Sequence, residues 1–229
     1  NNVAVGASAL NANTTGANNT ATGKSALSAN TTGTRNAALG TSSVAANTTG
    51  NNNTGVGYNA IATNLTGNDN TAVGKDSLLT NKGSNNTAVG SLALTANTTA
   101  SNNTAIGQES LHTNTTGADN VAVGRDALYS NTTASNNTAV GRDALVFNTT
   151  GASNVAVGKD ALKANTTGAS NTAVGYDSLK VNTTGTGNVA VGIDALQANT
   201  TAGTNTAVGK DAMYSNTTGY GVALGKGAL

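Results

Sequence analysis

Residues 137–153 read NTAVGRDALVFNTTGAS, and residues 154–170 repeat the pattern as NVAVGKDALKANTTGAS. The glycine that closes Ala-Val-Gly in these units returns along the whole chain, from Gly6 to Gly225. Fourteen such glycines are separated by eleven intervals of 17 residues and two intervals of 16. A period this short and unbroken indicates one small structural unit stacked on itself.

The composition excludes several classes of protein. Charged residues make up 9% of the chain and aromatic residues 3%, with no cysteine or proline, so neither an ordinary globular core nor disulfide bonds are expected. Disorder fits such a polar chain, but the strictly recurring apolar positions favour an ordered repeat. A net charge of +1 without a basic stripe gives no support for nucleic-acid binding. No stretch approaches the roughly 20 apolar residues of a membrane helix, so we expect no membrane contact within this segment.

Each unit is numbered here from its glycine, which is position 0. Position −2 is alanine except at Gly55, position −1 is almost always Val, Ile or Leu, position +3 is Ala or Ser, and position +4 is always apolar. A second asparagine usually opens Asn-Thr-Thr-Gly or Asn-Thr-Thr-Ala, as at Asn13. Position −4 is asparagine in thirteen of the fourteen units. Beyond the first unit these asparagines are Asn19, Asn36, Asn53, Asn70, Asn86, Asn103, Asn120, Asn137, Asn154, Asn171, Asn188 and Asn205.

This unit predicts an all-β fold. It is too short for two packed helices, and its β-branched residues with Asn/Gly punctuation indicate strand, turn, strand, turn. We therefore predict a parallel β-solenoid, or β-roll, of about fourteen coils of 17 residues, forming a single repeat domain over residues 1–229. Adjacent coils would lie about 4.8 Å apart. Because the chain begins and ends inside the repeat, we expect it to be a segment of a longer fibrous protein.

Stacking explains the unusual composition. The two asparagine rows are predicted to form ladders at two corners, with amide hydrogen bonds from coil to coil. Glycine at position 0 fits a third bend that requires a positive φ. The two 16-residue units lose a residue at Asn81-Lys82-Gly83 and at Gly219-Tyr220-Gly221. Both deletions fall in predicted turns, so the strands should stay in register.

The apolar positions also predict a partner. In a strand, positions −2 and −1 face opposite sides, and so do positions +3 and +4. One member of each pair can fill the coil, whereas the other would expose an apolar stripe that suits burial against another chain. We therefore expect a homo-oligomer, with a trimer favoured. The alternative is that the corner geometry turns both residues inward.

The Asn-Thr-Ala-Val-Gly segments, such as Asn70–Gly74 and Asn205–Gly209, and the Asn-Val-Ala-Val-Gly segments, such as Asn120–Gly124, resemble the head repeats of YadA-like trimeric autotransporter adhesins. Longer repeats of this kind also look like those of phage and bacterial tail-fibre proteins. The resemblance covers essentially the whole chain, although the adhesin repeat is shorter than this one. It implies a left-handed, trimeric β-roll in an extracellular fibre, at a cell or virion surface, with a host-surface glycan or matrix protein as partner.

No candidate for catalysis stands out, and we predict that the chain is not an enzyme and binds no cofactor. A nucleophile–base pair would rest on His112 alone, which we interpret as a solvated turn residue. The glycines lack the Gly-Lys-Ser/Thr context of a phosphate loop.

Position +2 is acidic in six consecutive units. These stacked carboxylates would repel one another by roughly 0.9 kcal/mol per pair even in bulk water. One interpretation is a cation-binding row, since Ca²⁺ takes several oxygen ligands. The favoured interpretation is an edge paired with Arg125, Arg142, Lys159 and Lys210 at position +1, without a metal. The acids are Asp126, Asp143, Asp160, Asp177, Asp194 and Asp211.

Twelve units carry Asn-x-Thr at the second asparagine, which is formally a glycosylation sequence. An asparagine turn ladder already explains them. Three functions stay open. The first is a structural fibre or stalk segment with an adhesive or display role, in which repeated weak contacts supply affinity. The second is an ice-binding solenoid, which the adjacent threonines of Asn-Thr-Thr do not favour because they alternate faces. The third is a passive spacer for a tip domain.

Overall fold

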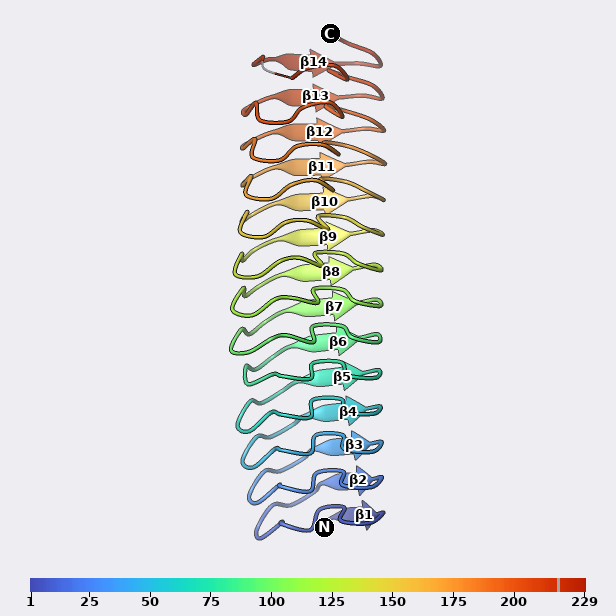
Figure 1. Ribbon diagram of the computed structural model, residues 1–229, viewed down its shortest axis with the longest axis vertical. Helices are drawn as coiled ribbons and strands as arrows, with labels where there is room; N and C mark the ends of the chain where they lie inside the picture. Colours follow the sequence, from blue (N-terminus) through green and yellow to red (C-terminus); the bar gives the residue numbers. More distant parts are fainter. Residues whose placement is uncertain (218) are drawn as a thin grey trace. The chain divides into compact units, whose positions relative to one another are not determined.

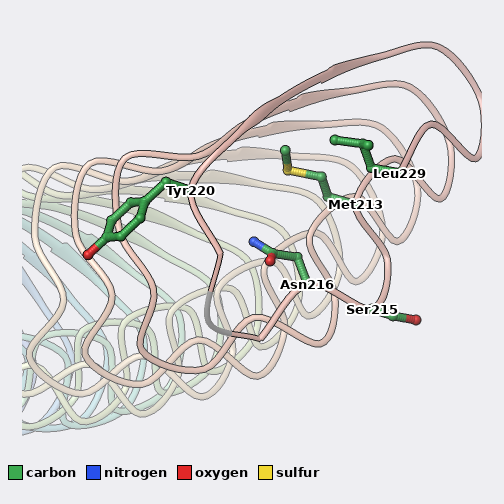
Figure 2. Close-up of a pocket in the computed structure, with 5 residues that line it drawn as sticks. All are labelled: Met213, Ser215, Asn216, Tyr220 and Leu229. Atoms are coloured by element: carbon green, nitrogen blue, oxygen red, sulfur yellow. The ribbon is translucent and has the colours of Figure 1, made fainter.

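The computed structural model describes residues 1–217 and 219–229, which divide into two compact units, Asn1–Thr116 and Gly117–Leu229. Each unit is a parallel β-solenoid with one three-residue strand per repeat, at positions −3 to −1 (Figure 1). The first unit contains β1 (Val3–Val5), β2 (Thr20–Thr22), β3 (Ala37–Leu39), β4 (Thr54–Val56), β5 (Thr71–Val73), β6 (Thr87–Val89) and β7 (Thr104–Ile106). The second contains β8 (Val121–Val123), β9 (Thr138–Val140), β10 (Val155–Val157), β11 (Thr172–Val174), β12 (Val189–Val191), β13 (Thr206–Val208) and β14 (Val222–Leu224).

Within each unit every strand pairs in parallel with the strand of the next repeat. The alanines at position −2 are partners, as Ala139 is with Ala156. The register survives both shortened units, because Thr71 pairs with Thr87 and Thr206 pairs with Val222. The predicted β-solenoid is thus confirmed, as is the placement of the deletions in turns. The expectation of a single repeat domain over residues 1–229 stays a prediction.

The interior of each coil is narrow and filled by small side chains. Alanine at position −2 is fully buried in nearly every strand, whereas its neighbours at −3 and −1 point outward and are half-buried or exposed. A fully buried leucine such as Leu145 occupies position +4, beside a buried Ala144 at position +3. The predicted alternation therefore holds at positions −2 and −1 but is wrong at positions +3 and +4, where both residues face inward.

The second strand predicted for each coil is absent from the described residues. Residues between position 0 and the second asparagine form consecutive turns instead. The cause is a left-handed backbone at positions +2 and +4, as at Asp143 (φ 59°) and Leu145 (φ 53°). Each left-handed residue reverses the local direction of the chain, so side chains no longer alternate between two faces. The alternative that both apolar residues turn inward is the one that the structure supports.

A left-handed conformation is costly for large apolar residues, and most of all for the β-branched Val44 and Ile61 at φ 51° and 54°. A strained conformation of this kind costs about 1–3 kcal/mol and persists only where its surroundings fix it. Here the surroundings are neighbouring coils. The N–H of Leu145 donates to the Ala161 carbonyl at 3.0 Å, and its own carbonyl accepts from Asn148 N–H at 3.0 Å. Complete burial of the leucine side chain adds about 1.5–3 kcal/mol of hydrophobic stabilisation.

Glycine at position 0 has a φ between 119° and 140°, which is open essentially to glycine alone. It also lies against the next coil. A Cβ on Gly141 would lie 2.5 Å from the carbonyl oxygen of Gly158, which is too close for two atoms that are not bonded. The predicted positive-φ bend is therefore confirmed, and close coil contact is a second reason for the glycine.

We expect Gly141→Ala to destabilise the second unit by about 3 kcal/mol or more, because it combines a forbidden φ with a backbone collision. The matched control is Gly187→Ser at position −5, where a Cβ would lie 3.6 Å from the nearest atom, Thr204 Cγ2. Ser153 and Ser170 already occupy that position in other coils of the second unit, so we expect a loss of less than about 1 kcal/mol. Thermal unfolding followed by circular dichroism compares the two variants. Equal losses would contradict this explanation of the repeat glycine.

Candidate functional site

The asparagines at position −4 form a buried row that completes the backbone hydrogen bonding of the coil. Asn154 Oδ1 accepts the backbone N–H of Asn171 at 2.9 Å, and the N–H of Asn154 donates to Asn137 Oδ1 at 2.9 Å. The amide therefore takes the place of a backbone carbonyl from the neighbouring coil. Asn154 is fully buried, so without this partner the N–H of Asn171 would be a buried, unsatisfied donor.

The second asparagine, at position +7, forms a direct side-chain ladder. Asn148 Nδ2 donates to Asn131 Oδ1 at 3.0 Å, and Asn165 Nδ2 donates to Asn148 Oδ1 at 2.8 Å. The same Nδ2 of Asn148 gives its other hydrogen to the Gly151 carbonyl at 2.9 Å. Both hydrogens of this amide are thus used inside the protein.

The two asparagines of one coil meet at the carbonyl of position +10. The Gly168 carbonyl accepts from Asn154 Nδ2 at 2.8 Å and from Asn165 Nδ2 at 2.9 Å. These bonds cross the interior and tie the start of the coil to its far corner. Each asparagine therefore links neighbouring coils and also closes its own coil.

The predicted −4 residues occupy equivalent places. They are buried at Asn19, Asn36, Asn53, Asn70, Asn86, Asn103, Asn120, Asn137, Asn154, Asn171, Asn188 and Asn205. The sequence suggested amide bonds between corner residues. It did not indicate that the −4 amide substitutes for a backbone group.

The acidic row at position +2 has a conformational origin that sequence reasoning missed. All six predicted residues have a φ between 56° and 59°. Asn, Asp and Ser are the residues in this row that tolerate a left-handed backbone best, and Ser8 and Asn59 occupy the same position. The signal available in the sequence was a short polar residue that recurs two positions after the repeat glycine. The row is Asp126, Asp143, Asp160, Asp177, Asp194 and Asp211.

Lysine or arginine side chains lie close to most of these acids. Arg125, Arg142, Lys159 and Lys210 each lie within 4.0 Å of the acid that follows them, as the sequence suggested. The structure adds Lys163, which contacts Asp160 at 2.9 Å and Asp143 of the preceding coil at 3.7 Å. Lys180 makes the same local contact with Asp177 at 2.9 Å. No group of three or more metal-ligating His, Cys, Asp or Glu side chains occurs among the described residues. The cation-binding row thus has no support in the geometry.

Asp160 is the acid most strongly engaged. Burial opposes its ionisation, but hydrogen bonds from Lys163 and Lys159, and the charges of both lysines, outweigh burial and lower the pKa of Asp160 below its ordinary 3.8. For Lys180, the hydrogen bond to Asp177 outweighs burial and raises the pKa above 10.5. These groups therefore stabilise the fold through their charges.

His112 occupies a turn at position +5 and is half-buried. The prediction that the chain is not an enzyme remains a prediction.

An outward apolar row is the remaining repeated feature. Position −1 exposes Leu39 by 53%, Ile106 by 40% and Val157 by 36%. The aliphatic residues of successive strands follow one another on one face of each sheet. This is part of the stripe expected from the sequence, now restricted to position −1.

No family model, curated protein or solved structure matches this chain. No described part of the chain forms a helix long and apolar enough to cross a membrane.

We expect Asn154→Ala to cost more than about 2 kcal/mol, because it orphans the buried N–H of Asn171 and opens a small cavity. Gln197→Ala serves as control, since the Gln197 side chain is half-buried at position +5 and lies outside both ladders. Thermal unfolding should show a clear fall in midpoint for the first variant and almost none for the second. A neutral Asn154→Ala would show that the ladder does not support the coil.

Acid should weaken the fold through Asp160. Because its pKa is lowered in the folded state, its contribution is fully present above pH 3.8 and is lost as the pH falls below 3.8 through the folded-state value. Asp160→Asn should lower the unfolding midpoint at neutral pH and make the decline at acidic pH shallower. Lys163→Met should act in the same direction. Parallel acid curves for the wild type and both variants would contradict the assignment.

Proposed function

We propose that this chain is a structural segment of an extracellular fibre or stalk at a cell or virion surface, with an adhesive or display role. The observation that carries the proposal is the outward aliphatic row at position −1, repeated on one strand after another. The aliphatic side chains at position −1 lie about 4.8 Å apart on successive strands and so form a continuous stripe along each unit. A contiguous apolar stripe on the surface of a soluble protein is typical of an interaction surface.

The partner that suits this face best is another copy of the chain. A repeated flat face presents the same residues at every level, so identical chains can align along their length with each level making equal contacts. A parallel homotrimer is the favoured form. This choice, with left-handed coils, rests on the resemblance to YadA-like adhesin repeats.

The remaining surface supports binding through many weak contacts. Most of the described coils carry an exposed threonine at position +9, and side chains at position +1 vary from coil to coil. Affinity for a host-surface glycan or matrix protein would then come from multivalency. A passive spacer needs only the rigid coils. Binding of the purified segment to cells or glycans separates the adhesive role from the spacer role.

Ice binding is less favoured. Threonine faces outward at position −3 in strands such as β9 and β11, but an aliphatic residue accompanies it at position −1. The hydroxyl of the threonine at position +8 donates a hydrogen bond to the next coil, as Thr149 Oγ1 does to the Thr166 carbonyl at 3.0 Å. If the purified chain shows thermal hysteresis, ice binding becomes the favoured function.

Leu39→Lys combined with Val157→Lys should convert the oligomer into a folded monomer, because it places charges on the outward row while leaving Ala38 and Ala156 buried. The matched control is Thr49→Lys with Thr167→Lys, which adds the same charge at exposed position +9 of the same coils. Sedimentation equilibrium measures the mass, and circular dichroism reports folding. A wild-type chain that is a folded monomer at all concentrations would refute the homo-oligomer.

A further inference from the structure

The chain contains seventeen Asn-x-Thr sequences, and the structure separates them into two groups. Twelve begin at the position +7 asparagine. Five others read Asn-Asn-Thr and begin at position −5, one residue before the buried −4 asparagine. The residues of this second group are Asn18, Asn52, Asn85, Asn102 and Asn136.

Ten of the twelve asparagines of the first group are fully buried in the folded chain and closed to modification, whereas Asn13 and Asn216 in the end coils are half-buried. Asn148 is fully buried, and its Nδ2 donates to both Asn131 Oδ1 and the Gly151 carbonyl. Replacing one of these hydrogens by a sugar would break a buried bond and require space that the coil does not have. Thr150, the threonine of this sequence, is exposed, but a transferase cannot reach the buried side chain of Asn148.

The second group has the opposite placement. Asn136 is exposed at a corner with a φ of 62°. Its backbone is held by the bond from its N–H to the Ala118 carbonyl at 3.1 Å, and not by its side chain. Ser153 and Gly187 occupy the same position in other coils, so the fold does not need the amide. The threonine of this sequence, Thr138, lies on the outward face of β9.

Asn18 and Asn85 share this exposed left-handed corner. Asn52 differs, because its Nδ2 donates to Asp69 Oδ1 at 2.8 Å and its Oδ1 accepts from Arg35 Nε at 2.7 Å. The bond from Nδ2 has to open before the amide can react. The group is therefore accessible but not uniform.

We propose that the position −5 asparagines of the Asn-Asn-Thr sequences are N-glycosylation acceptors of the folded chain, with a nucleotide-activated sugar as donor. The amide Nδ2 forms a bond to the anomeric carbon of the sugar. The bond from that carbon to the phosphate oxygen breaks, and the nucleoside diphosphate leaves with its electron pair. The amide gives up one proton to a base of the transferase.

The proposal imposes an order of events. In an unfolded chain both groups are equally accessible, and sugars on the position +7 asparagines would exclude them from the ladder. Folding must therefore come before sugar transfer. The coil itself then selects which Asn-x-Thr sequences are modified.

The test is to incubate the folded 229-residue chain carrying Leu39→Lys and Val157→Lys, in which no second copy covers the strand face around Thr138, with UDP-glucose and a soluble glucosyltransferase that modifies asparagine in Asn-x-Thr. Peptides from the digested, unfolded chain are treated in parallel. Mass spectrometry should place hexose on Asn18, Asn85 and Asn136 of the folded chain, with slower transfer to Asn52, and none on Asn148 or its buried equivalents. The peptides should be modified in both groups. Glucosylation of the folded chain should leave its unfolding midpoint unchanged.

Thr138→Val provides a matched control. Valine occupies position −3 in β8 and β10, so the variant should fold normally and lose the sugar at Asn136 alone. Modification of the ten buried position +7 asparagines in the folded chain would overturn the proposal. So would a folded chain that accepts no sugar although its peptides do, or continued modification of Asn136 after Thr138→Val.

Discussion

The structure depends on amide groups that replace missing backbone partners. A coil of 17 residues with one three-residue strand has few regular ladder bonds, and its corners leave N–H and C=O groups facing a narrow interior. The −4 asparagine accepts the N–H that no carbonyl reaches, and both asparagines converge on the carbonyl of position +10. Glycine at position 0 and leucine at position +4 keep their unusual conformations because their own N–H groups bond to neighbouring coils, as Gly141 does to the Val123 carbonyl at 2.8 Å and Leu145 does to the Ala161 carbonyl at 3.0 Å.

The sequence predicts the strand of each coil well. Residues 138–140 alternate outward, inward, outward, and the neighbouring residues in the sequence repeat the same types. The glycine bend and the tolerance of the two short units also follow from spacing. These features are local, or they come directly from the period.

The turn segment could not be predicted in the same way. Leu145 and Ile61 favour helix or strand, so nothing local indicates a left-handed backbone. Their conformation arises because neighbouring coils bond to them in register and bury them, and this is a property of the stack. The acidic row illustrates the same difficulty. A carboxylate at Asp143 looks like a ligand in the sequence, whereas its backbone angle accounts for its occurrence.

The single-residue deletion at Lys82 has a consequence for how the length of such a protein can change. Losing one residue from a corner leaves the strand pairing of Thr71 with Thr87 intact. A shortened coil therefore pairs with its neighbours in the same register as a coil of full length. A gene encoding this repeat can therefore gain or lose whole units by unequal recombination without creating an incompatible junction. Solenoids of different length can then be built from the same coil.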